Sequence, residues 1–355
     1  MIKKISSMLF IYIIGVFIGC TTVSANVEFE FSDELFSESV ILIDGKTGEI
    51  LFEQNSQQQM YPASITKIIT GILAIEEAEL SDTVIVSKNA REVIGTRVYL
   101  LEGEEVSLKK LVQGLLVSSG NDAGLAIAEH VSGSEKQFAK KMNQFVRGKV
   151  GVEETNFTNP HGLFDEDHYT TAYDMAKIAQ YAMKNDVFRE IVSTKELPWV
   201  GEGWETTIYN HNRMLWNYEG VTGIKNGYVQ KSGYTLVTSV EQGNTELIAV
   251  TLNAPSSKHA YRDTTRLFDF GFDNFETKRI PKDSEFEDPF GNNYTLAENL
   301  YVTTRKGESI FLDVSIYGYL KVIGRNNQLV GIHGLQRIEE QYTKRTPRFL
   351  ASLDR

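Results

Sequence analysis

Three short polar motifs limit most strongly what this chain can fold into. They are Ser64-Ile65-Thr66-Lys67, Ser119-Gly120-Asn121 and Lys225-Asn226-Gly227. The first opens a stretch with helical periodicity that runs to Ala78, and the second lies between two helical stretches. The third precedes a turn and the strand-like run Tyr234 to Val240. A chain that carries all three therefore combines helices with β-strands.

The first motif predicts a hydroxyl and an amine on one face of a helix. Ser64 falls in the first helical turn, where free backbone N–H groups and the helix dipole favour negative charge. Lys67 follows three residues later, which puts both side chains on the same face. A serine hydroxyl becomes a good nucleophile only when a base removes its proton. Lysine can be that base if burial or a nearby cation lowers its pKa. Taken alone, the motif fits equally a serine N-cap followed by a surface lysine.

The other two motifs offer polar groups that such a nucleophile needs. Ser119 has a hydroxyl for proton relay, and Asn121 has an amide for a substrate carbonyl. Lys225 would place a cation beside the nucleophile, and the missing side chain of Gly227 would let a substrate backbone come close. Each motif by itself also fits an ordinary turn, so only their combination favours chemistry.

In combination, the motifs resemble those of the serine D-alanyl-D-alanine carboxypeptidases, the low-molecular-mass penicillin-binding proteins. That family has S-x-x-K, S-x-N and K-T-G in this order. The flanking residues extend the resemblance over Tyr61 to Lys67, Leu116 to Ala123, Asn156 to Leu163, Gly223 to Lys225, and Gly233-Tyr234. It covers roughly residues 33–275, which we interpret as a catalytic domain.

The resemblance implies an α+β fold. A β-lactamase/transpeptidase-like sheet would be flanked by helices, with the active site between the sheet edge and a helical subdomain. Beyond Pro281 the chain changes to short β-rich runs separated by turn signals such as Gly291-Asn292-Asn293. We therefore predict a small all-β C-terminal domain over residues 276–355, similar to the family's smaller domain.

Residue patterns predict further elements along the chain. Ser39 to Ile43 and Ile50 to Phe52 read as a hairpin, and Thr170 or Thr171 as a helix N-cap. Predicted helices cover residues 108–117, 123–131, 134–150, 171–184 and 262–270, and predicted strands cover 234–240, 247–252, 300–304, 310–315 and 320–323.

The resemblance also implies a reaction. Ser64 would attack the carbonyl between the two terminal D-alanines of a peptidoglycan stem peptide, and Lys67 would take its proton. Ser119 would pass a proton towards the leaving amine. The acyl-enzyme would then be hydrolysed by water, and β-lactam antibiotics would acylate Ser64 as substrate mimics. The scheme needs no metal and no organic cofactor.

The implied substrate-binding residues flank this trio. Asn121 would hold the substrate amide, and Lys225 would bias Lys67 towards its neutral form and orient Ser119. The backbone N–H groups of Ser64 and Tyr228 would form an oxyanion hole, and Asn226 and Gly227 would complete the substrate-binding strand. Such an enzyme acts in peptidoglycan biosynthesis and cell-wall shaping.

Two positions depart from the family pattern. Asn226 stands where the third motif normally has Thr, and Ala260 stands where the family often has Arg. In the family both positions help to hold the substrate's terminal carboxylate. A DD-endopeptidase that cleaves peptidoglycan cross-links is therefore the nearest alternative. A penicillin-binding, non-catalytic wall scaffold is a second alternative, although the intact motifs argue against it. A β-lactamase is disfavoured, because no separate Glu-containing loop is evident to activate a deacylating water.

The histidines are predicted to be outside the chemistry. His161 lies in the family-like stretch, but the Ser–Lys scheme leaves it no task, so we assign it a structural role. The other histidines show no metal-ligand spacing such as H-E-x-x-H, so no metal site is expected.

The N-terminus indicates export. Residues 1–25 read as a signal peptide, with Lys3 and Lys4, an apolar run from Met8 to Gly19, and small residues at Val23-Ser24-Ala25. This predicts a secreted, extracytoplasmic protein of the cell envelope. Phe17-Ile18-Gly19-Cys20 loosely resembles a lipobox, so a lipoprotein anchored through Cys20 is the alternative.

Composition excludes several partners. With 355 residues and a formal net charge of -11, the chain lacks the surplus of Lys and Arg that nucleic-acid binding requires. Its single cysteine rules out an intrachain disulfide. The tail from Lys344 to Arg355 reads either as a weak amphipathic helix interrupted by Pro347 or as a solvated end. The amphipathic reading predicts peripheral membrane association through this tail, and the solvated reading predicts none.

Overall fold

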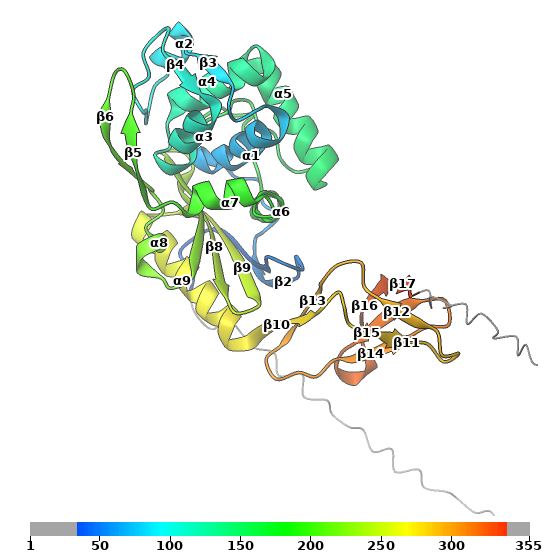
Figure 1. Ribbon diagram of the computed structural model, residues 1–355. Helices are drawn as coiled ribbons and strands as arrows, with labels where there is room; N and C mark the ends of the chain where they lie inside the picture. Colours follow the sequence, from blue (N-terminus) through cyan, green and yellow to red (C-terminus); the bar gives the residue numbers. More distant parts are fainter. Residues whose placement is uncertain (1–33, 339–355) are drawn as a thin grey trace, which may run out of the picture. The chain divides into compact units, whose positions relative to one another are not determined.

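The computed structural model describes residues 34–338. The predicted signal peptide, Cys20 and the tail beyond Lys344 lie outside the described residues. The described part of the chain has the predicted α+β fold, with helices flanking a central sheet and a strand-rich C-terminal part (Figure 1). None of its helices is both long enough and apolar enough to cross a membrane.

The central sheet brings together strands from both ends of residues 39–254. Its strand order is β2-β1-β9-β8-β7 and all neighbours are antiparallel. The strands are β1 (Ser39–Asp44), β2 (Ile50–Gln54), β7 (Val221–Val229), β8 (Gly233–Gln242) and β9 (Thr245–Ala254). The predicted hairpin is β1–β2, and β1 pairs with β9 from far along the chain. Strand β7 is left at one edge of the sheet.

Helices cover both faces of this sheet. Every residue of β1 is buried, which requires covering layers on both sides. Helices α6 (Ala172–Ala182) and α9 (Ser257–Asn274) each pack against β1, β8 and β9. Thr171 caps α6 by accepting a hydrogen bond from the Asp174 backbone N–H, as predicted.

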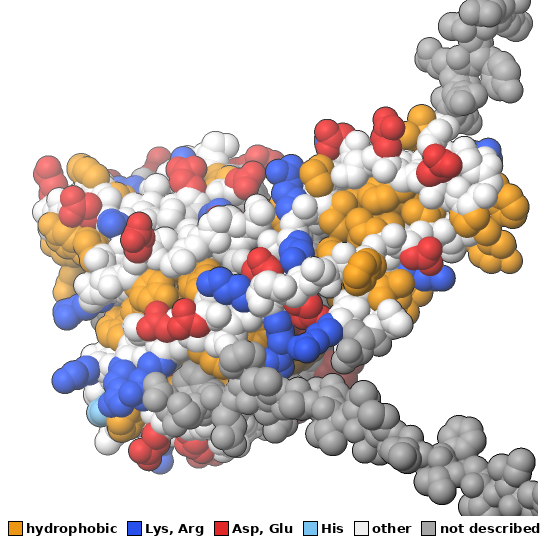
Figure 2. All heavy atoms as spheres, turned by 90° about the horizontal axis from the view of Figure 1, so that it is seen from below, with side chains coloured by type: hydrophobic (Ala, Val, Ile, Leu, Met, Phe, Trp, Pro, Cys, Tyr) orange, Lys and Arg blue, Asp and Glu red, His pale blue; other side chains and the backbone are white. Residues whose placement is uncertain are grey.

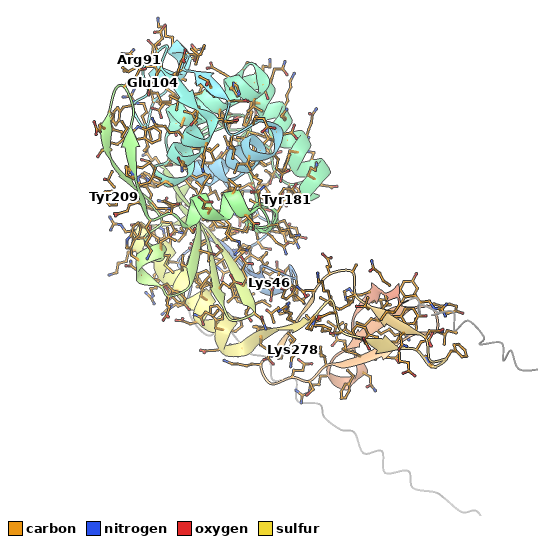
Figure 3. All side chains as sticks on the ribbon, in the orientation of Figure 1. Lys46, Arg91, Glu104, Tyr181, Tyr209 and Lys278 are labelled. Carbon is orange, nitrogen blue, oxygen red and sulfur yellow. The ribbon has the colours of Figure 1, made fainter. Side chains whose placement is uncertain are left out.

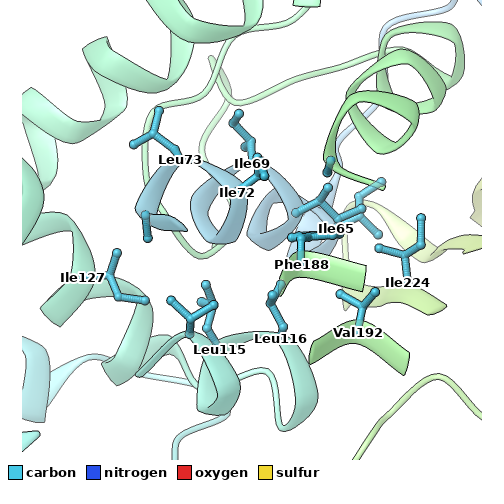
Figure 4. Packing of buried hydrophobic residues seen from close by; sticks show 14 of the residues in the cluster. Ile65, Ile69, Ile72, Leu73, Leu115, Leu116, Ile127, Phe188, Val192 and Ile224 are labelled. Carbon is cyan, nitrogen blue, oxygen red and sulfur yellow. The ribbon is translucent and has the colours of Figure 1, made fainter. Parts of the chain in front are cut away.

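A group of helices gathers beyond the end of the sheet around α1 (Figure 1). Its members are α1 (Lys67–Glu77), α2 (Lys88–Glu92), α3 (Leu108–Val117), α4 (Asn121–Ser132), α5 (Glu135–Phe145) and α7 (Asp186–Ser193), with the short strands β3 (Thr83–Ile85) and β4 (Glu105–Ser107). Helix α1 is buried from Lys67 to Ala74. Figure 4 shows Ile69 and Ile72 of α1, and Ile65 just before this helix, in one cluster with Leu115 and Leu116 of α3, Phe188 of α7 and Ile224 of β7. One hydrophobic core therefore connects the helical group to the edge strand.

Two predicted helices have different ends. Helix α9 begins at Ser257, five residues before the predicted start, because the Ser256 hydroxyl caps it by accepting from the His259 N–H. Its polar first turn carries no apolar periodicity, which hid this start. Helix α5 ends at Phe145 and continues as a π-helical turn, η2 (Val146–Val150), which ends at Gly151 with φ of 81°.

The hairpin β5 (Glu196–Val200) and β6 (Glu205–Tyr209), and the short helix α8 (Met214–Asn217), were not predicted. Pro198 interrupts the strand pattern of β5, and most side chains of the hairpin are solvent-exposed. Ile208 and Trp199 are the exceptions: both belong to the main core, and the larger of the two, Trp199, is fully buried there. It anchors the hairpin to α3, where a Cβ on Gly114 would lie 2.8 Å from the Trp199 ring.

Within residues 275–338, the described C-terminal part, the elements are strands and a short 3-10 turn, η3 (Arg325–Asn327). Its strands are β10 (Phe275–Ile280), β11 (Phe286–Glu287), β12 (Asn293–Thr295), β13 (Leu300–Arg305), β14 (Phe311–Val314), β15 (Tyr319–Ile323), β16 (Leu329–Gly334) and β17 (Gln336–Arg337). They enclose a second hydrophobic cluster that includes Leu320 and Val322. Phe311, Leu329 and Ile332 are exposed, and Figure 2 shows hydrophobic side chains gathered on the surface of these strands. The domain boundary near residue 276 stays a prediction.

Candidate active site

Ser64 and Lys67 form the close pair that their spacing predicts. Ser64 lies in a 3-10 turn, η1 (Ala63–Thr66), and Lys67 is the first residue of α1. The Lys67 Nζ donates a hydrogen bond of 3.0 Å to the Ser64 Oγ. Ser64 is partly exposed, whereas Lys67 has no exposed surface. The hydroxyl is therefore open to a substrate while the amine beneath it is shielded from water.

Two further acceptors fix the Lys67 amine. Its Nζ donates to the Asn121 Oδ1 at 2.7 Å and to the His161 backbone oxygen at 2.6 Å. Burial lowers the pKa of Lys67 well below its ordinary value, and the charge of Lys225 lowers this pKa further. The charge of Asp122 acts in the opposite direction and is the smaller influence. The lowered pKa favours the neutral form of the Lys67 amine, which can accept a proton.

Asn121 joins the lysine to a loop on the far side of the site. It is the first residue of α4, and its Nδ2 donates to the Ile94 oxygen at 2.7 Å. Its backbone N–H donates to the Thr96 oxygen, also at 2.7 Å. The adjacent Asp122 accepts from the Val98 and Leu100 N–H groups. Helix α4 and the loop over residues 94–100 are therefore held as one unit.

Ser119 lies in the turn between α3 and α4. It has a φ of 62°, a left-handed backbone conformation that is strained for serine, and it is 5% exposed. Its hydroxyl makes no hydrogen bond to any described residue, so the structure does not join it to Lys67 or to Lys225. Its predicted relay role stays a prediction.

Strand β7 passes directly beside Ser64. A Cβ on Gly227 would lie 2.6 Å from the Ser64 backbone nitrogen, so only glycine fits there. The Thr235 hydroxyl of β8 donates to the Pro62 oxygen at 2.9 Å, which ties the sheet to the serine turn. Tyr228 is 54% exposed and its ring lies 4.5 Å from that of Tyr234.

Lys225 points to its own neighbour. It is 1% exposed, and its Nζ donates to the Asn226 backbone oxygen at 2.9 Å and to the Asn226 Oδ1 at 3.3 Å. Burial lowers the pKa of Lys225 to about 7. Residues of the first and third motifs lie together in the structure, where η1 packs against β7.

Sequence reasoning missed how His161 takes part. Its backbone oxygen, and not its imidazole, contacts Lys67. The imidazole Nε2 lies 3.2 Å from the Glu135 Oε1. Gly162 beside it has a φ of 84°, and a Cβ there would lie 1.8 Å from the Ala63 oxygen. This loop packs tightly against the turn that carries Ser64. The contact fixes the position of the His161 oxygen, which accepts a hydrogen bond from Lys67. The residue stretch 156–163 was recognised as family-like, but no local pattern indicated the contact.

A cavity of ≈ 600 Å³ opens on the other side of Asn226. Asn226 lies on β7, Tyr209 ends β6, and Ser257 and Tyr261 belong to α9. His211 and Arg213, from the segment before α8, also line the wall of this cavity. Figure 3 shows Tyr209 where the hairpin β5–β6 returns towards α8.

No metal site accompanies these groups in the described residues. They contain no cluster of three or more His, Cys, Asp or Glu side chains able to hold a metal ion. The acid–base groups of the site are a serine and two buried lysines.

Comparison with known proteins gives a consistent result. The chain is 33% identical to D-alanyl-D-alanine carboxypeptidase DacF of Bacillus subtilis over 299 residues, which covers 82% of this chain and 73% of that protein. It is 34% identical to D-alanyl-D-alanine carboxypeptidase DacD of Escherichia coli over 260 residues, covering 70% of this chain and 66% of that protein.

Solved structures agree. Penicillin-binding protein 5 from Haemophilus influenzae matches with a TM-score of 0.74 and 27% identity, covering 86% of this chain and 98% of that one. Penicillin-binding protein 6B from Escherichia coli matches with a TM-score of 0.72 and 28% identity, covering 84% and 95%. A sequence profile described as D-alanyl-D-alanine carboxypeptidase, peptidase family S11, matches residues 23–256. The chain therefore belongs to the D-alanyl-D-alanine carboxypeptidase family.

Proposed function

We propose that this chain is a serine D-alanyl-D-alanine carboxypeptidase that removes the terminal D-alanine from peptidoglycan stem peptides through an acyl-enzyme on Ser64. The observation that carries the proposal is the 3.0 Å hydrogen bond between the Ser64 hydroxyl and the buried Lys67 amine. A nucleophile and a base in such contact form the minimal unit of covalent acyl transfer.

The first half of the reaction forms the acyl-enzyme. The Ser64 Oγ attacks the carbonyl carbon of the penultimate D-alanine while its proton passes to the neutral Lys67 Nζ. The negative oxygen that develops is stabilised by the backbone N–H groups of Ser64 and Tyr228. Such donors typically contribute about 10²–10³ in rate each. Collapse of the intermediate breaks the peptide bond, and the leaving amine receives the proton held by Lys67, by way of Ser119.

The second half returns the enzyme to its starting state. A water molecule attacks the ester carbonyl and gives its proton to the neutral Lys67 amine, which passes that proton to the Ser64 oxygen as the ester bond breaks. The stem peptide departs one residue shorter, with a new carboxylate. Lys67 therefore accepts and returns one proton in each half-reaction, and no cofactor enters the balance.

The edge position of β7 supports a mode of substrate binding. An unpaired strand edge offers N–H and C=O groups that an extended peptide can pair with. Gly227 lets this strand pass directly beside the Ser64 turn, so a peptide paired with the strand edge would lie next to the Ser64 hydroxyl. A β-lactam, which places a strained amide in the same position, would acylate Ser64 and stay bound.

The proposed substrate also fits an extracytoplasmic location in the cell envelope, where peptidoglycan lies. Export by the predicted N-terminal signal would bring the enzyme there. Lipidation at Cys20 would keep the same compartment.

Two measurements test the function. A fluorescent penicillin should label the wild-type protein but not Ser64→Ala, and mass spectrometry should place the adduct on Ser64. The wild-type protein should release free D-alanine from a diacetyl-Lys-D-Ala-D-Ala tripeptide. Cleavage of a cross-linked muropeptide dimer without release of D-alanine would replace the proposal by an endopeptidase function. Labelling without either cleavage would indicate a wall-binding scaffold.

A further inference from the structure

The cavity beside Asn226 has a cationic wall that the proposed chemistry leaves unused. Arg213 lines this cavity and is exposed, and none of the lining residues is acidic. Among the described residues its guanidinium has no ion pair and no hydrogen bond. In a chain with a net charge of -11, an arginine left without a carboxylate in a concave site is available for an anion from outside.

The segment that carries Arg213 is firmly attached to the catalytic sheet. The neighbouring Asn212 is fully buried, and its Nδ2 donates to the Gly223 oxygen at 2.9 Å and to the Thr238 Oγ1 at 3.2 Å. The Arg213 backbone N–H donates to the Tyr261 hydroxyl at 3.4 Å, and this hydroxyl donates to the His211 oxygen at 3.2 Å. The backbone of Arg213 is therefore held at a defined place next to β7 and α9.

Asn226 contributes a second donor to the same cavity. Its Oδ1 accepts from the Lys225 Nζ, which directs the oxygen of the amide towards that lysine. The Nδ2 of the amide has no partner among the described residues. A guanidinium and an amide N–H thus line one concave surface, immediately beside the strand that faces Ser64.

No other residue that lines this cavity carries a permanent positive charge. His211 lies in its wall, but loss of surrounding water and the charges of Lys225 and Lys67 lower its pKa to about 4, so it is neutral at pH 7. Arg262 lies 4.6 Å from the centre of the Phe36 ring and is not among the lining residues. Lys258 is not among them either. Arg213 is therefore the permanent positive charge of the wall.

We propose that Arg213, assisted by the Asn226 amide, binds the free carboxylate of the substrate's C-terminal residue. The assignment rests on the proposed function. It means that the positive charge missing from α9 at Ala260 is supplied by the segment before α8. The planar guanidinium suits a carboxylate because two parallel N–H groups can bond to its two oxygens. The site then makes this chain selective for peptides that end in a free acid.

Kinetics on a matched pair of substrates test this. We compare diacetyl-Lys-D-Ala-D-Ala with the same tripeptide bearing a C-terminal amide. In Arg213→Gln, kcat/KM for the acid should fall about 10–100-fold, because hydrogen bonds to a charged group contribute roughly 1.5–3 kcal/mol. The value for the amide should change less than about threefold. Arg213→Lys should keep part of the preference. Arg262→Gln, which removes the same charge from α9, should leave the ratio of acid to amide unchanged.

Binding measurements separate this proposal from the proposed function. Ser64→Ala should bind the acid more tightly than the amide in calorimetry, and Ser64→Ala combined with Arg213→Gln should bind both equally. Equal binding of acid and amide by Ser64→Ala overturns the carboxylate site, even if the wild-type enzyme releases D-alanine. Preferential binding of the acid, together with no release of D-alanine by the wild-type enzyme, keeps the site and overturns the carboxypeptidase function. Thermal unfolding confirms that each variant is folded.

Discussion

Gly227 and Ser64 approach each other so closely that the strand and the nucleophile depend on one missing side chain. A Cβ at residue 227 would lie 2.6 Å from the Ser64 backbone nitrogen and 3.1 Å from the Ala63 Cβ. That nitrogen is one of the two proposed oxyanion donors. We therefore expect catalysis to depend on the distance between the edge strand and the serine turn.

Gly227→Ala should lower the rate of penicillin acylation by about 10²-fold or more, because the turn or the strand must shift and the oxyanion donor moves with it. Stopped-flow fluorescence with a labelled penicillin measures the rate. Gly148→Ala is the matched control, since a Cβ there meets no atom within 4 Å. An unchanged acylation rate in Gly227→Ala would contradict the proposed position of the oxyanion hole.

Gly162→Ala should damage both stability and activity. The new Cβ would lie 1.8 Å from the Ala63 oxygen, and the backbone has a φ of 84°. We expect a loss of about 2–4 kcal/mol in the free energy of unfolding, and slower acylation because the His161 oxygen is displaced from Lys67. Gly133→Ala separates the two causes, because Gly133 has a φ of 75° but open space around it. That control should lose only about 1 kcal/mol and keep full activity. Equal losses in both variants would show that the Ala63 contact does not matter.

Acylation should depend on pH through Lys67. Only the neutral amine accepts the serine proton, so the rate rises as pH passes the lowered pKa of Lys67 and then levels off. The charge of Lys225 helps to lower that pKa, so Lys225→Gln should move the rising limb to higher pH. Second-order acylation rates from about pH 5 to 10 give the profile. Lys258→Gln, outside the site, should leave it in place. A limb that stays fixed in Lys225→Gln would argue against the coupling between the two lysines.

His168 should make the fold sensitive to acid. It is buried, and burial and the charges of His161 and Lys67 lower its pKa from 6.5 to about 3. The unfolded chain therefore binds more protons than the folded one between these values, so stability present above pH 6.5 is lost as pH falls. We expect about 2 kcal/mol less free energy of unfolding at pH 5 than at pH 6.5 from this group.

Urea unfolding at the two pH values measures the effect. His168→Gln, which keeps a donor for the Thr66 hydroxyl, should reduce the pH dependence while lowering stability at neutral pH. If the variant and the wild type lose the same stability between the two pH values, His168 is not the group responsible.

Local spacing was enough to predict the parts of the site that lie close in sequence. The Ser64–Lys67 contact follows from three residues of helical rise, and the β1–β2 hairpin follows from its turn residues. The contacts that tune the site come from tertiary packing. Lys67 meets the His161 oxygen from 94 residues away, and no periodicity encodes that distance. The role that we propose for Arg213 could not be predicted for the same reason, because it depends on which strand Arg213 lies beside in the folded chain.

The departures at Asn226 and Ala260 show a second limit. Compared residue by residue with a family pattern, they look like two lost ligands for the same carboxylate. In three dimensions Arg213, on a different segment, lines a cavity close to both positions. Asn226 lines this cavity too, and Ala260 is the sequence neighbour of Tyr261, which also lines it. A sequence pattern records positions, whereas binding depends on where charged groups end up in space.

The pairing of β1 with β9 has a consequence for the order in which this protein becomes active. Strand β1 occupies an inner place in the sheet, yet its partner ends only at Ala254, and the edge strand beside Ser64 lies on the far side of that partner. Loop closure over such a span must precede the contacts that reward it. In a chain that emerges N-terminus first from a ribosome or a translocation channel, we thus expect Ser64 to appear well before the edge strand that completes the proposed site. Reactivity towards acyl donors appears only when almost the whole catalytic part has emerged.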